Sequence, residues 1–230
     1  MSETTSAARL TPSRTAWKLN KHDVAVGTVI VVVLCTTFSW LSSGASLLVT
    51  FLPGAAFAWL TLLQLYRRRQ PLPELGTFLP VYFLTLSIQF VHFAEEFVTG
   101  FPTDFARLYG GEPYDVNLFI VFNMTAYSVF TAAAVLAFTK RIGFLLVPVL
   151  FFLMYGAIGN AIAHTYWSIL VGGYFPGLVT AQLYWIAGPW TIHVLTGRRH
   201  PRVVIGLTAA IAVVLVPLLG IFADTSSLVP

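Results

Sequence analysis

The chain has 230 residues, of which 57% are hydrophobic and 10% are charged, and its mean hydropathy is +0.80. Soluble globular domains contain about 25% charged residues, so this composition excludes that class and predicts an integral membrane protein. The formal net charge is +4. The single cysteine, Cys35, excludes an intrachain disulfide and a cluster of thiolate metal ligands.

The order of apolar runs along the chain predicts its architecture. Residues 1–23 are polar and basic, without the apolar core and cleavage site of a secretory signal, and we expect them to form a disordered cytoplasmic tail. A spanning helix needs about twenty mostly apolar residues. The predicted fold class is all-α, a polytopic transmembrane helix bundle with a membrane domain at 24–222 and an outer tail at 223–230. Its seven spans are expected at residues 24–42, 46–66, 77–98, 116–138, 142–171, 177–196 and 203–222.

The basic residues predict the orientation of this bundle. If the amino terminus is cytoplasmic, the inner segments carry every lysine and arginine of the chain except Arg107. Inner loops of membrane proteins are enriched in these residues, so we expect the amino terminus inside and the carboxyl terminus outside a plasma membrane. The positive charge then lies beside anionic lipid headgroups and indicates no nucleic-acid partner.

An unusual group of polar residues lies in the third predicted span, in the stretch QFVHFAEEFVTGF at 89–101. His92, Glu95 and Glu96 have the i, i+3, i+4 spacing of one helix face, and Asn160 and His164 in the fifth span are an i, i+4 pair. A carboxylate that faces lipid costs several kcal/mol, so we expect these faces to point into the bundle.

Depth connects these residues to others. At about 1.5 Å per residue, the polar residues of four spans reach one level in the outer half of the bilayer. They are His92, Glu95, Glu96, Asn123, Asn160, His164, Gln182 and Tyr184. A shared polar site is therefore predicted, while two simpler interpretations stay open. In one, the amides only join helices and His92 and Glu96 only pair with each other; in the other, the glutamates lie at a solvated helix end.

The motifs also carry a family resemblance. HFAEE at 92–96, followed by GNAIAH at 159–164 and YFPGLVTA at 174–181, resembles the HXXEE-domain family of bacterial integral membrane proteins. The likeness covers about residues 80 to 196. It implies a polytopic protein in which His92, Glu95, Glu96, Asn160, His164 and the turn Tyr174-Phe175-Pro176-Gly177 occupy motif positions.

Two imidazoles and a carboxylate suit a divalent metal such as Zn, Fe or Mn. We expect His92, Glu96 and His164 as metal ligands, which leaves a coordination position open for water or substrate. The catalytic group is expected to comprise Glu95, as general base or as a partner of the ligands, together with Glu96, Asn123 and Asn160. The predicted function is a membrane-embedded enzyme that acts on a lipid or isoprenoid substrate.

A metal-free alternative uses the same residues. A glutamate in a dry site can donate a proton, and aromatic faces stabilise carbocations. The chain is similar in size and span number to membrane terpene cyclases, which favours acid-catalysed isoprenoid cyclisation. Transport and structural roles also stay open. The side chains expected to line the substrate are Phe93, Tyr127, Trp167, Gln182, Tyr184 and Trp185.

Overall fold

The computed structural model describes residues 17–197 and 201–228, and within these ranges the chain is helical with no strand. Six helices are long and apolar enough to cross a bilayer. They are α1 (Lys21–Leu41), α2 (Ser46–Arg67), α3 (Leu75–Val98), α5 (Val116–Lys140), the helical run Gly143–Leu170 and α10 (Pro201–Ile221). Their lengths and compositions are those of a multi-pass membrane protein.

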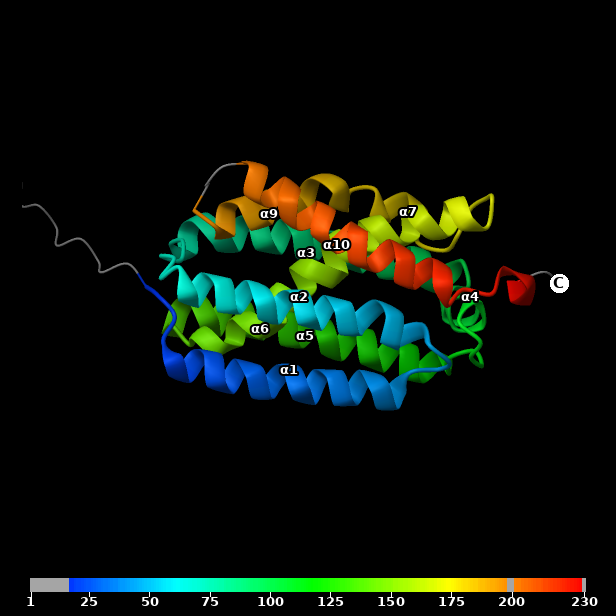
Figure 1. Cartoon of the computed structure of the whole chain (residues 1–230), viewed down its shortest axis with the longest axis horizontal. Coiled ribbons are helices and arrows are strands. Elements are labelled where there is room, and N and C mark those ends of the chain that lie inside the picture. Colours follow the sequence, from blue (N-terminus) through cyan, green and yellow to red (C-terminus); the bar gives the residue numbers. More distant parts are fainter. Residues whose placement is uncertain (1–16, 198–200, 229–230) are drawn as a thin grey trace, which may run out of the picture.

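The long helices share one axis, with the start of α1 and the end of α10 at opposite ends of the bundle (Figure 1). At the end where α1 begins, the Trp17 carbonyl accepts a hydrogen bond from the Leu72 amide at 2.9 Å, and Gln70 Nε2 donates to the Thr196 carbonyl at 3.2 Å. We call this the basic end, because these segments and the neighbouring helix termini carry described basic residues. They are Lys18, Lys21, Arg67, Arg68, Arg69, Lys140, Arg141 and Arg202.

The opposite end is closed by α4 (Phe101–Leu108), the loop after it and η3 (Thr225–Leu228). The Ser43 amide donates to Tyr114 Oη at 2.9 Å, and the Asp224 amide donates to the Leu108 carbonyl at 2.8 Å. Arg107 belongs to this end, since its carbonyl accepts a hydrogen bond from Ser227 Oγ at 2.9 Å. The described part of the expected outer tail, 223–228, is therefore docked onto α4, and residues 229–230 lie outside the described ranges.

The helical run Gly143–Leu170 is the centre of the bundle. It consists of η1 (Gly143–Leu145), α6 (Leu146–Phe151), the π-helical segment η2 (Phe152–Gly159) and α7 (Asn160–Leu170). Its most apolar window is 89% buried, whereas the other candidate spans reach between 17% and 50%. Neighbouring helices approach η2 closely at glycines: a Cβ on Gly54 of α2 would lie 2.5 Å from Tyr155 Cβ, and one on Gly188 would lie 2.8 Å from Ile158 Cγ1.

The expected span at 177–196 differs from the prediction. It consists of α8 (Leu178–Ala181) and α9 (Tyr184–Leu195), separated by a turn at Gln182 and Leu183. The 12 residues of α9 extend about 18 Å, less than the ~30 Å of a hydrocarbon core. This segment is not among the six candidate spans. A seventh crossing therefore stays a prediction.

The first helix begins three residues before the predicted boundary at 24. The Asn20 side chain accepts from the Asp23 amide at 3.1 Å, and Asp23 Oδ2 accepts from the Asn20 amide at 2.9 Å. This reciprocal capping box starts α1 at Lys21, so residues 21–23 belong to the helix and not to the tail. The disorder expected of residues 1–16 lies outside the described ranges.

Candidate metal centre

Three buried side chains from two helices meet near the end of the bundle that α4 closes. His92 and Glu96 lie on α3, one turn apart, and His164 lies on α7. Glu96 Oε1 is 3.3 Å from His92 Nε2 and 3.3 Å from His164 Nε2. Both imidazoles are fully buried, Glu96 is 5% exposed, and the potential ligand atoms lie within 4.8 Å of one another. The structure therefore brings together the three residues predicted as metal ligands.

The proton position on His164 follows from its other ring nitrogen. His164 Nδ1 is 2.8 Å from the carbonyl oxygen of Pro176. A carbonyl oxygen only accepts, so Nδ1 must carry a proton and donate it. In the neutral imidazole, Nε2 then presents a lone pair. That lone pair lies beside Glu96 Oε1.

His92 is oriented through a longer chain of contacts. His92 Nδ1 is 2.8 Å from Thr180 Oγ1, and the same hydroxyl also donates to Glu95 Oε2. The single proton of the Thr180 hydroxyl is donated in the hydrogen bond to the Glu95 carboxylate. Thr180 Oγ1 must therefore accept a hydrogen bond from His92 Nδ1. The neutral His92 ring is thereby fixed with its lone pair on Nε2, also directed at Glu96.

The Glu95 carboxylate is held by several donors at the start of α8. The amide of Val179 donates to Oε1 at 2.9 Å, the amide of Thr180 donates to Oε2 at 2.7 Å, and Tyr174 Oη donates to Oε1 at 2.7 Å. Partial burial raises the pKa of the Tyr174 hydroxyl, and the adjacent Glu95 carboxylate raises it further, so Tyr174 remains a donor at neutral pH. Of the two roles predicted for Glu95, this arrangement favours the partner of a ligand over the general base.

When both imidazoles are neutral, three acceptor atoms therefore converge without a proton to share. Within the described chain, His92 Nε2 and His164 Nε2 are buried and have no hydrogen-bond partner. An unpaired buried polar atom costs about 1–3 kcal/mol, and here two lone pairs also face a carboxylate oxygen. Either a proton on one imidazole or a cation between the three atoms relieves this conflict.

A glycine in the α7–α8 loop allows this close packing. Gly177 has φ +88°, in the left-handed region that other residues rarely adopt. A Cβ at this position would lie 2.6 Å from His164 Cε1 and 3.0 Å from Glu96 Cγ. The motif glycine thus fits both the turn and the space beside the triad.

A cavity of about 460 Å³ adjoins the triad. Glu96 of α3, Gln89 of α3 and Asn160 of α7 line it on the side of the triad, and α1, α2 and α5 supply most of the remaining wall. Small-molecule sites have volumes of about 300–1,000 Å³, so the cavity is large enough for a ligand. Glu96 thus touches both the histidines and the cavity.

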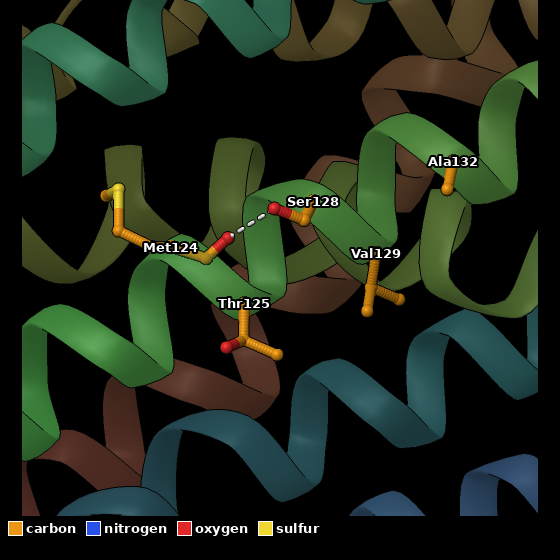
Figure 2. Close-up of a pocket in the computed structure, with 5 residues that line it drawn as sticks. All are labelled: Met124, Thr125, Ser128, Val129 and Ala132. Atoms are coloured by element: carbon orange, nitrogen blue, oxygen red, sulfur yellow. Dashed lines mark hydrogen bonds between the residues drawn. The ribbon is translucent and has the colours of Figure 1, made fainter.

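A second, shallow hollow lies on the outer face of α5 (Figure 2) and shares Thr125 and Val129 with the cavity. Its lining residues are Met124, Thr125, Ser128, Val129 and Ala132. Ser128 Oγ donates to the carbonyl of Met124 at 2.8 Å, so its hydroxyl is occupied within the helix. The hollow has no ionisable side chain and plays no part in the triad.

A chain of hydrogen bonds crosses the bundle beside the cavity. Tyr184 Oη donates to Gln89 Oε1 at 2.7 Å, Gln89 Nε2 donates to Tyr127 Oη at 3.2 Å, and Tyr127 Oη donates to Asn123 Oδ1 at 3.1 Å. Asn123 Nδ2 donates to the Phe119 carbonyl at 2.9 Å. Asn123, expected in the catalytic group, lines the cavity, but its amide is already engaged in hydrogen bonds within α5.

The other residues expected to line the substrate are distributed differently. Tyr127 lines the cavity, whereas Phe93 stacks on Phe119 with ring centroids 5.4 Å apart. Trp167 is fully buried against His164, with ring centroids 4.9 Å apart. Gln182 and Trp185 are exposed, and both donate to Thr165 Oγ1. These two, with Phe93, Trp167 and Tyr184, do not line the cavity.

Sequence reasoning did not assign the roles of several residues at or near the triad. Thr180 and the Pro176 carbonyl hold the two imidazoles, and Gln89 joins α3 to Tyr184 and Tyr127. Thr180, Pro176 and Gly177 all lie in YFPGLVTA, so the presence of that motif was the available signal. Gln89 is a polar residue one turn before His92 and gave the same kind of signal.

Comparison with models of known families, with curated proteins and with solved structures finds no match to this chain.

Proposed function

We propose that this protein is a membrane-embedded enzyme in which His92, Glu96 and His164 hold a divalent metal ion, and that it acts on a lipid or isoprenoid substrate. The observation that carries the proposal is the convergence of two buried histidine Nε2 atoms, which have no hydrogen-bond partner, on one carboxylate oxygen beside a cavity. The resemblance to the HXXEE-domain family belongs to the same proposal.

The donor set fits such an ion. Zinc ligands lie about 2.0–2.1 Å from the metal, so neighbouring ligands of a tetrahedral site are separated by about 3.3 Å. Both nitrogen-to-oxygen distances at Glu96 are 3.3 Å. Metal-binding histidines commonly donate their other ring proton to an oxygen atom, as His92 and His164 do here.

Each residue then has a distinct role. A metal at this position supplies a Lewis acid or an activated water. Glu96 provides the anionic ligand at the edge of the cavity, and the proposed role of Asn160, which lines the same wall, is to hold a substrate oxygen. Glu95 and Thr180 fix the tautomer of His92, and the Pro176 carbonyl fixes that of His164.

The proposed orientation places the basic end in the cytoplasm, with α8 and α9 as a seventh crossing of a plasma membrane. The clustering of the described lysines and arginines at one end, with Arg107 at the other, supports this orientation. The candidate metal centre then lies in the outer half of the bilayer.

The proposal is tested by elemental analysis of the purified protein. We expect about one Zn, Fe or Mn ion per chain, the stoichiometry of a three-ligand site. The double variant His92→Ala, His164→Ala should lose the metal, whereas His193→Ala should keep it, because His193 lies on α9 away from the triad. Stoichiometric metal in the double variant would contradict the proposal.

A second candidate is acid-catalysed isoprenoid cyclisation, because a proton among the three acceptor atoms also relieves their conflict. A metal enzyme should lose activity in chelator and gain it as ligands deprotonate with rising pH. A cyclase should keep activity in chelator and lose it at high pH, and Glu96→Gln should abolish it because an amide supplies no such proton. Activity on membrane lipids and polyprenyl compounds, measured with and without chelator, separates the two.

A further inference from the structure

The cavity beside Glu96 reaches the apolar surface of the bundle. Its wall includes Leu34, Thr37 and Phe38 of α1 and Val121 and Val129 of α5. Val121 is 61% exposed and Val129 is 47% exposed, so the cavity extends to side chains on the exposed apolar surface of the bundle. Because α1 and α5 both contribute lining residues here, the opening of the cavity to this surface falls between α1 and α5.

The lining is apolar near this opening and charged at the triad. Aromatic and aliphatic side chains from α1, α2 and α5 form most of the wall. Among the described residues that line the cavity, Glu96 is the charged one, and it lies on the opposite side, on α3. Ligand sites of this kind bind an apolar body and orient it with a few polar groups.

The length of the cavity matches one lipid chain. On α5 its lining runs from Leu118 to Phe130, a separation of about 18 Å at 1.5 Å per residue. A hydrocarbon core of about 30 Å gives each leaflet about 15 Å. The lining along α5 is therefore long enough for a single chain that lies parallel to the helices.

We infer that this cavity binds one long hydrocarbon chain, which enters sideways from the bilayer between α1 and α5 and places a small polar end group at Glu96. This inference rests on the proposed function, whose substrate class and route of access it specifies. The shared chemistry is a single apolar chain with one polar end, whether the source is a fatty acyl or a polyprenyl compound.

The test uses photo-crosslinking of the full-length purified protein with two probes, a diazirine-bearing fatty acid and a diazirine-bearing polyprenol. We expect at least one probe to label peptides of α1 and α5 that line the cavity, as read by mass spectrometry. The probe that labels identifies the source of the chain. Labelling by neither probe, or equal labelling of cavity peptides and the exposed face of α10, would overturn the inference.

Matched pairs of variants locate the binding. Ala126 lines the cavity and Ala132 does not, although both lie on α5, and Ala132 lies at the outer hollow (Figure 2). Ala126→Trp should reduce labelling by about tenfold or more, since displacing even two methylene groups costs ~1.6 kcal/mol. Ala132→Trp should leave it unchanged. Equal labelling of these two variants would also overturn the inference.

A second pair covers the case in which Ala126→Trp fails to fold. Thr37 lines the cavity from α1, whereas its neighbour Thr36 is exposed and does not line it. Thr37→Trp should reduce labelling and Thr36→Trp should not. Metal content separates this inference from the proposed function: full metal without labelling rejects the chain-binding site alone, and cavity labelling without metal rejects the metal centre alone.

Discussion

Adjacent glutamates in the HFAEE motif have different surroundings. Glu96 is one helical turn from His92 and points toward both histidines. Glu95, one residue earlier on the same helix, points toward the start of α8. The Glu95 carboxylate contacts His92 only through Thr180. One glutamate is therefore a candidate ligand, and the other sets the proton position on a candidate ligand.

The role of Thr180 can be tested with an isosteric change. Thr180→Val removes both the acceptor for His92 Nδ1 and the donor to Glu95, so the His92 tautomer is no longer fixed. Loss of such a partner commonly weakens metal binding by about 10–100-fold. Metal competition with a fluorescent chelator should show this loss in Thr180→Val and near-native affinity in Thr180→Ser.

A buried hydroxyl outside the site provides the control. Thr191 Oγ1 lies 2.6 Å from Thr85 Oγ1 and joins α9 to α3. Thr191→Val should lower the free energy of unfolding about as much as Thr180→Val does, because each removes one buried hydroxyl. It should leave metal affinity unchanged. If Thr180→Val and Thr191→Val bind metal equally well, Thr180 does not position His92.

The candidate ligand residues were predictable from sequence because two simple constraints act on them. Helical spacing puts His92 and Glu96 on one face, and the cost of a buried carboxylate directs that face inward. Thr180 could not be predicted in the same way. Its role depends on the direction of one hydroxyl, and threonine in a membrane helix usually bonds its own backbone.

At the scale of elements, the α7–α8 loop shapes the candidate site as much as the long helices do. It supplies the Pro176 carbonyl, the left-handed Gly177 and the first turn of α8 that holds Glu95. The sequence predicted one continuous span at 177–196, since apolar composition alone does not show where a helix is interrupted. Gln182 and Trp185 were misplaced for the same reason.

The glycine in this loop gives an element-scale prediction. Gly177→Ala adds a Cβ 2.6 Å from His164 Cε1 at φ +88°, and strain of this kind costs about 1–3 kcal/mol. We expect a lower thermal unfolding midpoint and weaker metal binding. Gly173→Ala is the matched control in the same loop, because a Cβ there meets nothing within 4 Å. Equal effects of the two substitutions would show that the triad does not need this space.

The π-helical segment η2 also affects the candidate site at the scale of elements. η2 ends at Gly159, and Asn160 and His164 occupy the first and second turns of α7 beyond it. π-helical turns are frequent at functional sites because they alter which side chains face a given direction. Hydrophobic periodicity predicted the helix here but not this change of winding, since most of the central helix is buried.

At the scale of the whole molecule, the two ends of the bundle differ in charge, and this difference was visible in the sequence. Hydrogen bonds of Trp17, Gln70 and Thr196 connect the segments at the basic end, and all described basic residues except Arg107 lie at this end. Charge alternation depends only on chain order, so it was predictable. The packing of helices around η2 depends on side-chain fit, which sequence spacing does not determine.

The last prediction concerns the crossing by α8 and α9, on which the depth of the candidate site depends. In a Cys35→Ser background, Glu112→Cys and Gly173→Cys should react with an impermeant thiol reagent from outside the cell, because both positions are exposed and belong to the end opposite the basic one. Arg68→Cys and Arg202→Cys are exposed at the basic end and should react only after the cell is opened. If Gly173→Cys and Arg202→Cys react from the same side, α8 and α9 do not cross, and the chain has six spans with both termini on one side.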